Sequence, residues 1–465
     1  MTDDLFDLSL AEIASRLTSE PALARSLAEE AIARRAAQPE LGTGPYREWR
    51  ADIARAMADG AVASLMAGAA GPLCGIPVSV KDLYGVAGTA TYAGTPAALP
   101  AAFETEGWLV GLLRAQGAIF TGKTHTVEFA FGGLGVNGHW GSVRNPWDPT
   151  TWRVSGGSSA GAGVSLAEGS ALLALGTDTG GSVRIPAAMT GNVGLKTTIG
   201  RWPTTGVVPL SHSLDTVGIL TRTIADAAFA FAAIEGTDPV AARPLSGLRI
   251  GRIARLAFDD CSPGIAEAVD TALAELEAAG ATLVDIEFAE AGTAFDLLCN
   301  SGIPAMELRR AIDASLPDWL DSMDWPVKRR MVGTDTTKTA HYENSLKALA
   351  AACAAANERF AEVDLVACPT VPITPPAVDS VAEPETYAPQ NLKSLRNTAI
   401  GNYLGLCGVT LPVGLDAAGM PVGLQLLHRG GGDREVLEMA LGVEAALGTG
   451  RTRIGTAPGV VTPRR

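Results

Sequence analysis

The chain has 465 residues, of which 47% are hydrophobic and 18% are charged, so it has ample material for a large globular core. Its formal net charge of −14 argues against nucleic-acid binding, which requires a basic surface. No run approaches the roughly 20 apolar residues of a membrane-spanning helix, and the acidic start Met1–Asp4 is unlike a signal peptide. We therefore expect a soluble, cytoplasmic protein that binds neither nucleic acid nor membrane.

The six cysteines and five histidines are scattered along the chain, without a CxxC or HExxH pair. Such spacing is typical of free thiols in a reducing compartment rather than of a disulfide framework. It also predicts that the protein has no metal site.

The first part of the chain, residues 8–68, has a helical pattern. Leu23, Leu27 and Ala31 would share one apolar face, and Ser19, two residues before a proline, is a helix start signal. We expect helices throughout this part.

From about residue 70, short β-type runs alternate with helical stretches, such as the apolar stripe at 108–113 that ends at Gly117. This alternation implies an α/β sheet covered by helices on both faces. The expected strands are 76–80, 118–121, 171–175, 248–253 and 284–288.

The alternation resumes after the short proline-containing stretch 238–247, so we predict one large domain. Its parts would be a helical segment at 1–70, a core at 71–240 and a remainder at 241–465. A mobile insertion is expected around 300–345.

Two glycine motifs suggest nucleotide binding. Residues 117–124 match the phosphate-binding pattern GxxxxGK[ST], but a helix precedes them and the would-be loop is an apolar strand. A helix C-cap followed by a core strand fits better, although a nucleotide-binding protein stays open as an alternative. Residues 133–138 match GxGxxG without a following helix, which favours a surface or pocket loop.

A third motif, at 157–161, matches the GxSxG nucleophile elbow of α/β-hydrolases, with Ser159 in the central position. The residues before it are poor strand material, and no acid and histidine pair stands out later, although His428 is available. The motif passes directly into an alanine-rich helix, which indicates a structured loop.

A fourth motif follows a buried strand and reads Gly-Gly-Ser, ending at Ser182. Successive glycines allow backbone N–H groups to converge, as an oxyanion site requires. Asp178 and Arg184 flank this loop and would pair to brace it.

Three segments together carry a resemblance. Lys81 ends an apolar strand, Ser158 lies in a Gly-Gly-Ser-Ser loop, and Ser182 follows 24 residues later. This arrangement resembles the amidase signature family, whose catalytic set is a serine, a bridging serine and a lysine. Further matching stretches lie at 122–124, 128–130, 145–146, 194–196, 214–218, 411–414 and 419–425.

The resemblance implies that Ser182 is the nucleophile, Ser158 the proton bridge and Lys81 the terminal base. Lysine accepts a proton only when neutral, so burial must lower its pKa. The resemblance also implies a cis peptide between Gly157 and Ser158. The alternative is that Lys81 is a surface lysine paired with the adjacent Asp82.

Other roles follow from the same resemblance. The oxyanion hole would consist of the backbone N–H groups of Thr179, Gly180, Gly181 and Ser182. Ser159, Asp178 and Arg184 would support the site.

The implied fold is a central mixed, twisted sheet in a single large domain, and the implied activity is hydrolysis of a small-molecule amide, carbamate or hydrazide through an acyl-enzyme, without a cofactor. From the resemblance alone we also expect a homodimer. The substrate pocket should draw on 131–140, 300–345 and the stretch near Asn402.

The alternative within the family is the glutaminase subunit of a tRNA-dependent amidotransferase, which works with a partner subunit. That subunit usually carries Gln where this chain has Ile185, and an acid that holds the glutamine amine. Residues 391–403 contain no acid, so we favour an amidase that acts alone.

Overall fold

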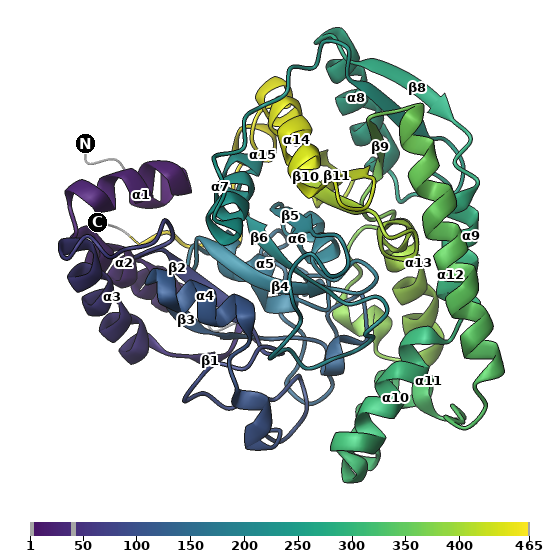
Figure 1. Ribbon diagram of the computed structural model, residues 1–465, viewed down its shortest axis with the longest axis horizontal. Coiled ribbons are helices and arrows are strands. Elements are labelled where there is room, and N and C mark those ends of the chain that lie inside the picture. The colour runs from purple at the N-terminus through teal and green to yellow at the C-terminus, as the bar shows by residue number, and fades with distance from the viewer. Residues whose placement is uncertain (1–3, 39–42, 464–465) are drawn as a thin grey trace.

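An 11-stranded mixed β-sheet runs through the middle of the protein (Figure 1). The computed structural model describes residues 4–38 and 43–463. Of the start Met1–Asp4 that we contrasted with a signal peptide, the first three residues lie outside this part. The strand order is β1-β3-β2-β4-β6-β5-β10-β11-β9-β7-β8. The strands are β1 (Tyr46–Trp49), β2 (Pro77–Lys81), β3 (Ile119–Thr124), β4 (Leu173–Asp178), β5 (Val193–Lys196), β6 (Thr216–Thr221), β7 (Arg249–Ile253), β8 (Thr282–Ile286), β9 (Leu365–Pro369), β10 (Cys407–Leu415) and β11 (Pro421–His428).

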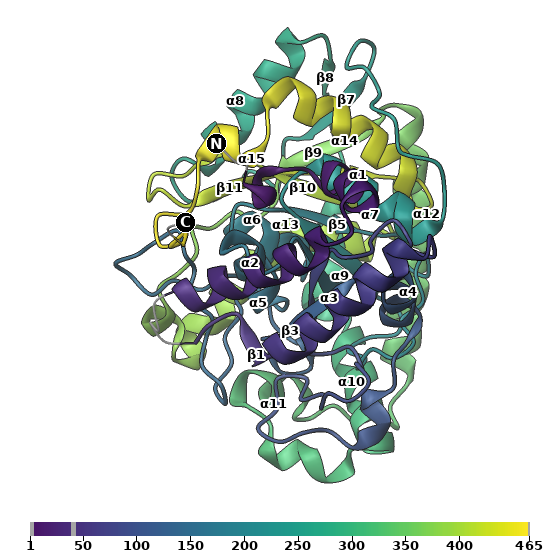
Figure 2. The same cartoon turned by 90° about the vertical axis from the view of Figure 1, so that its left-hand side faces the viewer.

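Helices cover both faces of this sheet, as predicted, and Figure 2 shows α2 and α3 in front of β1 and β3. The α-helices are α1 (Leu10–Ser19), α2 (Leu23–Ala37), α3 (Ala51–Met66), α4 (Trp108–Gln116), α5 (Ala160–Ala167), α6 (Arg184–Met189), α7 (Ile224–Glu235), α8 (Ile265–Ala278), α9 (Glu290–Asn300), α10 (Ile303–Ser315), α11 (Trp325–Met331), α12 (Ala340–Glu358), α13 (Pro384–Tyr403), α14 (Asp433–Leu447) and α15 (Gly450–Ile454). The short 3-10 helices are η1 (Leu5–Asp7), η2 (Ala101–Glu104), η3 (Glu128–Ala130), η4 (Pro317–Ser322), η5 (Arg359–Ala361) and η6 (Val378–Val381). Among the described residues, no helix is both long and apolar enough to cross a membrane.

The C-terminal hairpin joins the two ends of the sheet. β10 pairs with β5 on one side, β11 pairs with β9 on the other, and β10 and β11 pair with each other. The sheet contains parallel pairs, such as β2 with β3 and with β4, beside antiparallel ones such as β4 with β6. The predicted α/β fold with a mixed sheet is therefore confirmed.

Alternation along β2 determines where its lysine lies. Val78 and Val80 are buried in the largest hydrophobic core, whereas Ser79 and Lys81 point to the other face because side chains alternate along a strand. Ser79 Oγ lies 2.8 Å from Ser165 Oγ of α5 on that face. Lys81 is therefore directed toward the loop that leads into α5.

The helical prediction for residues 8–68 is wrong at two points. Tyr46–Trp49 form an edge strand, because Tyr46 pairs with Thr124 of β3 and its hydroxyl lies 3.0 Å from Thr121 Oγ1. Ser19 ends α1 rather than starting a helix. The helix start signal is Ser9 instead, whose hydroxyl accepts from the backbone N–H of Glu12 in a capping box.

Residues 117–124 do not form a phosphate-binding loop. Gly117 is the left-handed C-cap of α4, with φ of 89°, and the rest of the motif belongs to buried strand β3. Lys123 Nζ donates to the carbonyl of Tyr84 and forms an ion pair with Asp82 at 3.0 Å. This segment therefore provides neither the phosphate-binding loop nor the free lysine that the nucleotide-binding alternative requires.

Candidate active site

Lys81, at the end of β2, has no exposed surface. Its Nζ lies 2.7 Å from Ser158 Oγ and donates to Thr177 Oγ1 at 2.8 Å. Burial lowers the pKa of Lys81 to about 7, although Asp178 and Asp215 act in the opposite direction. The amine is thus buried against a serine and can both take up and release a proton near neutral pH. The surface-lysine alternative is wrong, because Asp82 pairs with Lys123.

Ser158 lies in the loop before α5, after a cis peptide bond from Gly157. The next residue, Ser159, ties this loop to the nucleophile loop. Its hydroxyl donates to the carbonyl of Ser182 at 2.6 Å, and its backbone N–H points to the same oxygen at 3.3 Å. Ser159 therefore faces a backbone carbonyl, which is a poor arrangement for the central serine of a nucleophile elbow.

Asp178 organises the loop between β4 and α6. Its carboxylate accepts from the backbone N–H of Gly181 at 2.8 Å and of Val183 at 3.1 Å, and from Nε and Nη2 of Arg184 at 3.0 Å each. Burial favours a raised pKa for Asp178, but the Arg184 guanidinium holds that pKa well below its usual value. The structure thus places Asp178 and Arg184 in contact as a charged brace.

Arg184 is itself held from distant parts of the chain. Its Nη1 donates to Gln425 Oε1 of β11, and its Nη2 to Asn402 Oδ1 of α13, both at 2.6 Å. Asn402 Nδ2 donates in turn to Asp178 Oδ1 at 2.9 Å. From the sequence we expected the stretch near Asn402 to contribute to the substrate pocket and assigned no role to Gln425. The contacts of both residues with Arg184 were not predicted.

Ser182 is 3% exposed, and it lines a cavity of about 420 Å³ with Thr179 and Gly180. Gly181 is not one of the residues that line this cavity, and its N–H donates to Asp178. Among the described residues, the N–H groups of Thr179, Gly180 and Ser182 have no acceptor within hydrogen-bond distance. These three donors are therefore unengaged and belong to residues that line the cavity, whereas the fourth predicted donor is engaged.

The rest of the cavity wall is mainly apolar and aromatic. It comes from the loop at 130–132, the end of α9 and start of α10, α11, and one side of α13, with Trp325 and Tyr387 among its large side chains. The regions 131–140 and 300–345 were expected to contribute and do. The contribution of α13 extends back to Tyr387, well before the expected stretch near Asn402.

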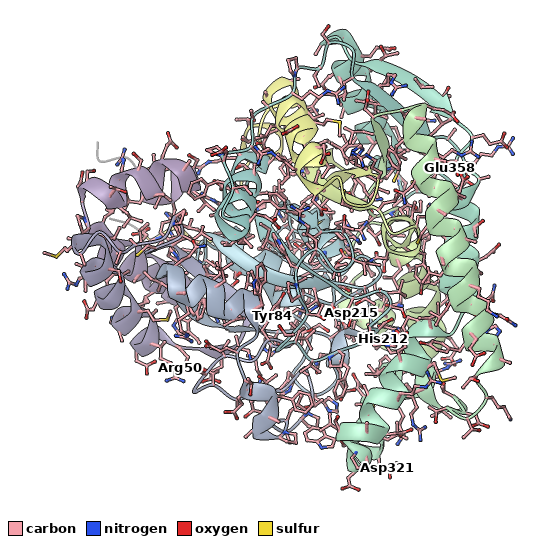
Figure 3. All side chains as sticks on the ribbon, in the orientation of Figure 1. Arg50, Tyr84, His212, Asp215, Asp321 and Glu358 are labelled. Carbon is pink, nitrogen blue, oxygen red and sulfur yellow. The ribbon has the colours of Figure 1, made fainter. Side chains whose placement is uncertain are left out.

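Asp215 supports the cavity edge. Its carboxylate accepts from Thr179 Oγ1 at 2.6 Å and from the backbone N–H groups of Leu210 and Ser211 at 2.9 Å each. Burial raises the pKa of Asp215 to about 6. Figure 3 shows Asp215 with His212 near the middle of the molecule. Asp215 lies in a stretch that we noted, but its position beside the nucleophile loop was missed.

Within the described part of the chain, the hydroxyls of Ser158 and Ser182 are not hydrogen-bonded to each other. The structure therefore brings Lys81 and Ser158 into direct contact and places Ser182 at the cavity. In residues 4–38 and 43–463, no three His, Cys, Asp or Glu side chains gather in a way that would hold a metal ion.

Comparison with known proteins agrees with the resemblance seen in the sequence. The family model described as Amidase matches residues 29–437, which is most of the chain. The chain belongs to the amidase family. As an amidase it is an amidohydrolase that acts on C–N bonds, as predicted.

Three curated relatives of this amidase match most of its length. The 2-amino-5-chloromuconic acid deaminase of Comamonas testosteroni is 48% identical, covering 96% of this chain and 98% of the relative. The indoleacetamide hydrolase of Pseudomonas savastanoi is 33% identical, covering 81% and 84%. A glutamyl-tRNA(Gln) amidotransferase chain of Ralstonia nicotianae is 31% identical, covering 93% and 96%.

A solved structure described as "Crystal structure of amidase" superposes with a TM-score of 0.85 at 30% identity, covering 95% of this chain and all of that one. The fold of the amidase family is therefore present from the N-terminal helices to the C-terminal hairpin.

Proposed function

We propose that this amidase cleaves the C–N bond of a small amide-type molecule through an acyl-enzyme on Ser182. Support comes mainly from the buried contact of 2.7 Å between Lys81 Nζ and Ser158 Oγ, beside the cavity that Ser182 lines. An amide, carbamate or hydrazide suits this chemistry. The mechanism proposed below uses only side chains and backbone groups of the protein, together with water.

In the first step, the Ser182 hydroxyl attacks the carbonyl carbon of the substrate. Its proton passes to Ser158, whose own proton passes to the neutral amine of Lys81. The negative charge on the substrate oxygen is stabilised by the free N–H groups of Thr179, Gly180 and Ser182. Gly181 acts differently, because its N–H fixes the loop through Asp178.

The second half of the reaction returns the protons. Lys81 gives its proton back to Ser158, which protonates the leaving nitrogen as the C–N bond breaks. A water molecule then attacks the acyl-enzyme while its proton passes through Ser158 to Lys81. As the bond between the acyl carbon and Ser182 Oγ breaks, Lys81 returns this proton through Ser158 to Ser182, and the acid product leaves. Ser159, Asp178 and Arg184 position the loop and take no proton in this scheme.

The glutaminase alternative fits the cavity less well. Glutamine carries an ammonium group that needs an acidic partner, and none of the described residues that line the cavity is acidic. We therefore propose an amidase that acts without a partner subunit.

Labelling with a fluorophosphonate probe tests this proposal. We expect the probe to modify Ser182, as located by peptide mass mapping, and Lys81→Ala to abolish the label because Ser182 then loses its base. Ser79→Ala serves as the matched control, because Ser79 lies on the same strand as Lys81 and its hydroxyl contacts Ser165 rather than a residue of the proton relay. This variant should keep the label. A label on Ser159, or a Ser182 label that survives Lys81→Ala, would contradict the proposal.

A further inference from the structure

The charges around the cavity are all of one sign. Arg329 and Arg330, both on α11, are the charged residues among the described ones that line it, and no such lining residue is acidic. This is unusual for the chain as a whole, in which 50 acidic residues outnumber 36 basic ones. A buried or half-buried cation without a carboxylate nearby requires compensation from another group.

Arg330 is held in place by neutral groups. Its Nη1 donates to the carbonyl of Phe131 at 2.5 Å, and its Nη2 to the hydroxyl of Tyr387 at 3.4 Å. Its guanidinium lies 4.6 Å from the centre of the Phe131 ring, a favourable cation–π distance. These contacts fix the guanidinium plane and use two of its five N–H groups. The other three have no hydrogen-bond acceptor among the residues that the structure describes.

The acids on neighbouring elements are committed elsewhere. The carboxylate of Asp324, just before α11, accepts from the backbone N–H groups of Trp325 and Gly138. Asp215 binds Thr179, and Glu128 accepts from the backbone N–H of Asp324 and contacts His139. Among the described residues, no carboxylate lies within ion-pair distance of Arg330.

We propose that the cavity binds substrates that carry a carboxylate, which pairs with the guanidinium of Arg330 while the scissile C–N bond lies at Ser182. This inference rests on the proposed function, because both ends of the substrate occupy the same cavity. Arg330 is a specificity-determining residue in this view. Arg329, which is exposed at the cavity wall, adds positive charge near it.

The apolar walls strengthen this pairing. The rings of Phe131 and Tyr387 lie beside the guanidinium, and Trp325 packs against Tyr387 in the same cavity wall, so a bound carboxylate would be removed from much of the solvent. A charge-assisted, two-point contact of Arg with a carboxylate is stronger and more directional there than in water. A neutral amide of the same size would leave the free N–H groups of Arg330 unpaired.

Binding without turnover tests the inference separately from the chemistry. The ligands are muconate, a small dicarboxylate, and its neutral dimethyl ester, titrated calorimetrically into the full-length Ser182→Ala protein. Arg330→Gln in that background should weaken muconate binding at least tenfold and change binding of the ester less than twofold. Lys328→Gln is the matched control on the same helix. Lys328 pairs with Asp321, which Figure 3 places at the lower tip of the molecule, away from Asp215.

Muconate affinity should also fall as NaCl rises from 50 to 500 mM, while ester affinity stays constant. This comparison needs no substitution at Arg330, so it holds even if Arg330→Gln folds poorly. Absence of muconate binding, an unchanged affinity in a folded Arg330→Gln protein, or an equal loss in Lys328→Gln would overturn the inference. Failure of the acyl-enzyme proposal would be seen instead as a missing label on Ser182.

Discussion

Lys81 combines complete burial with a hydrogen-bonding serine, and its protonation should control the reaction. Because burial lowers its pKa to about 7, the amine is mostly charged below that pH and cannot accept a proton. We expect kcat/KM to rise about tenfold per pH unit below pH 7 and to level off above it. The measurement is kcat/KM from pH 5 to 9 on a neutral amide, whose own charge does not change.

Asp215 provides the control for this assignment, because its own pKa is about 6. The carboxylate of Asp215 raises the pKa of Lys81, so Asp215→Asn should move the rising limb to lower pH without removing it. If the limb vanishes in Asp215→Asn, Asp215 rather than Lys81 is the titrating group. A profile that is flat down to pH 5 would remove the role of Lys81 as base.

At the scale of elements, the conformation of the nucleophile loop between β4 and α6 depends more on Gly181 than on Gly180. Gly181 has φ of 135°, and a Cβ there would lie 2.0 Å from Thr398 Oγ1. A Cβ on Gly180 would meet its closest neighbour, Leu395 Cδ2, at 3.5 Å. We therefore expect Gly181→Ala to displace the loop and to lower kcat at least a hundredfold. A shift of a catalytic group by about 1 Å can reduce the rate by this factor.

Gly180→Ala is the matched substitution on the same loop, and it should retain most of kcat because the added methyl group has room. The comparison is made from initial rates on proteins shown to have the same far-UV circular dichroism. Equal losses in the two variants would mean that the backbone of Gly181 does not hold the loop.

Local patterns explain why much of this architecture was predictable. Lys81, Ser158 and Ser182 lie at strand ends and in glycine-rich loops, where spacing along the chain is informative. The partners of Arg184 were not predictable, because Asn402 and Gln425 are 218 and 241 residues away in the chain. Strand β1 was missed for a related reason, since its pairing with β3 is a tertiary contact.

The charge of the cavity also escaped sequence analysis. Arg329 and Arg330 lie in a helical segment that carries an ordinary mixture of charges, and only the fold reveals that no acid among the described residues lines the same cavity. The mobile insertion at 300–345 and the homodimer stay predictions.

At the scale of the whole molecule, the mostly exposed stretch at 238–247 connects two parts of one sheet. The hairpin of β10 and β11 is inserted between β5 and β9, so strands from before and after this stretch share one core. Residues 1–240 alone would leave the edge of β5 unpaired, and Arg184 would lose the side chains of Gln425 and Asn402.

We therefore expect the 1–240 fragment to aggregate, because an unpaired apolar edge and a buried charged pair without its partners are both unfavourable. Size-exclusion chromatography and circular dichroism measure this outcome. The control is the full chain with a protease site inserted in the exposed segment 241–244. After cleavage, both pieces should elute together and keep the fluorophosphonate label on Ser182, because the sheet holds them without the connecting peptide. A monomeric 1–240 fragment with a cooperative unfolding transition would instead show that the N-terminal part is a domain of its own.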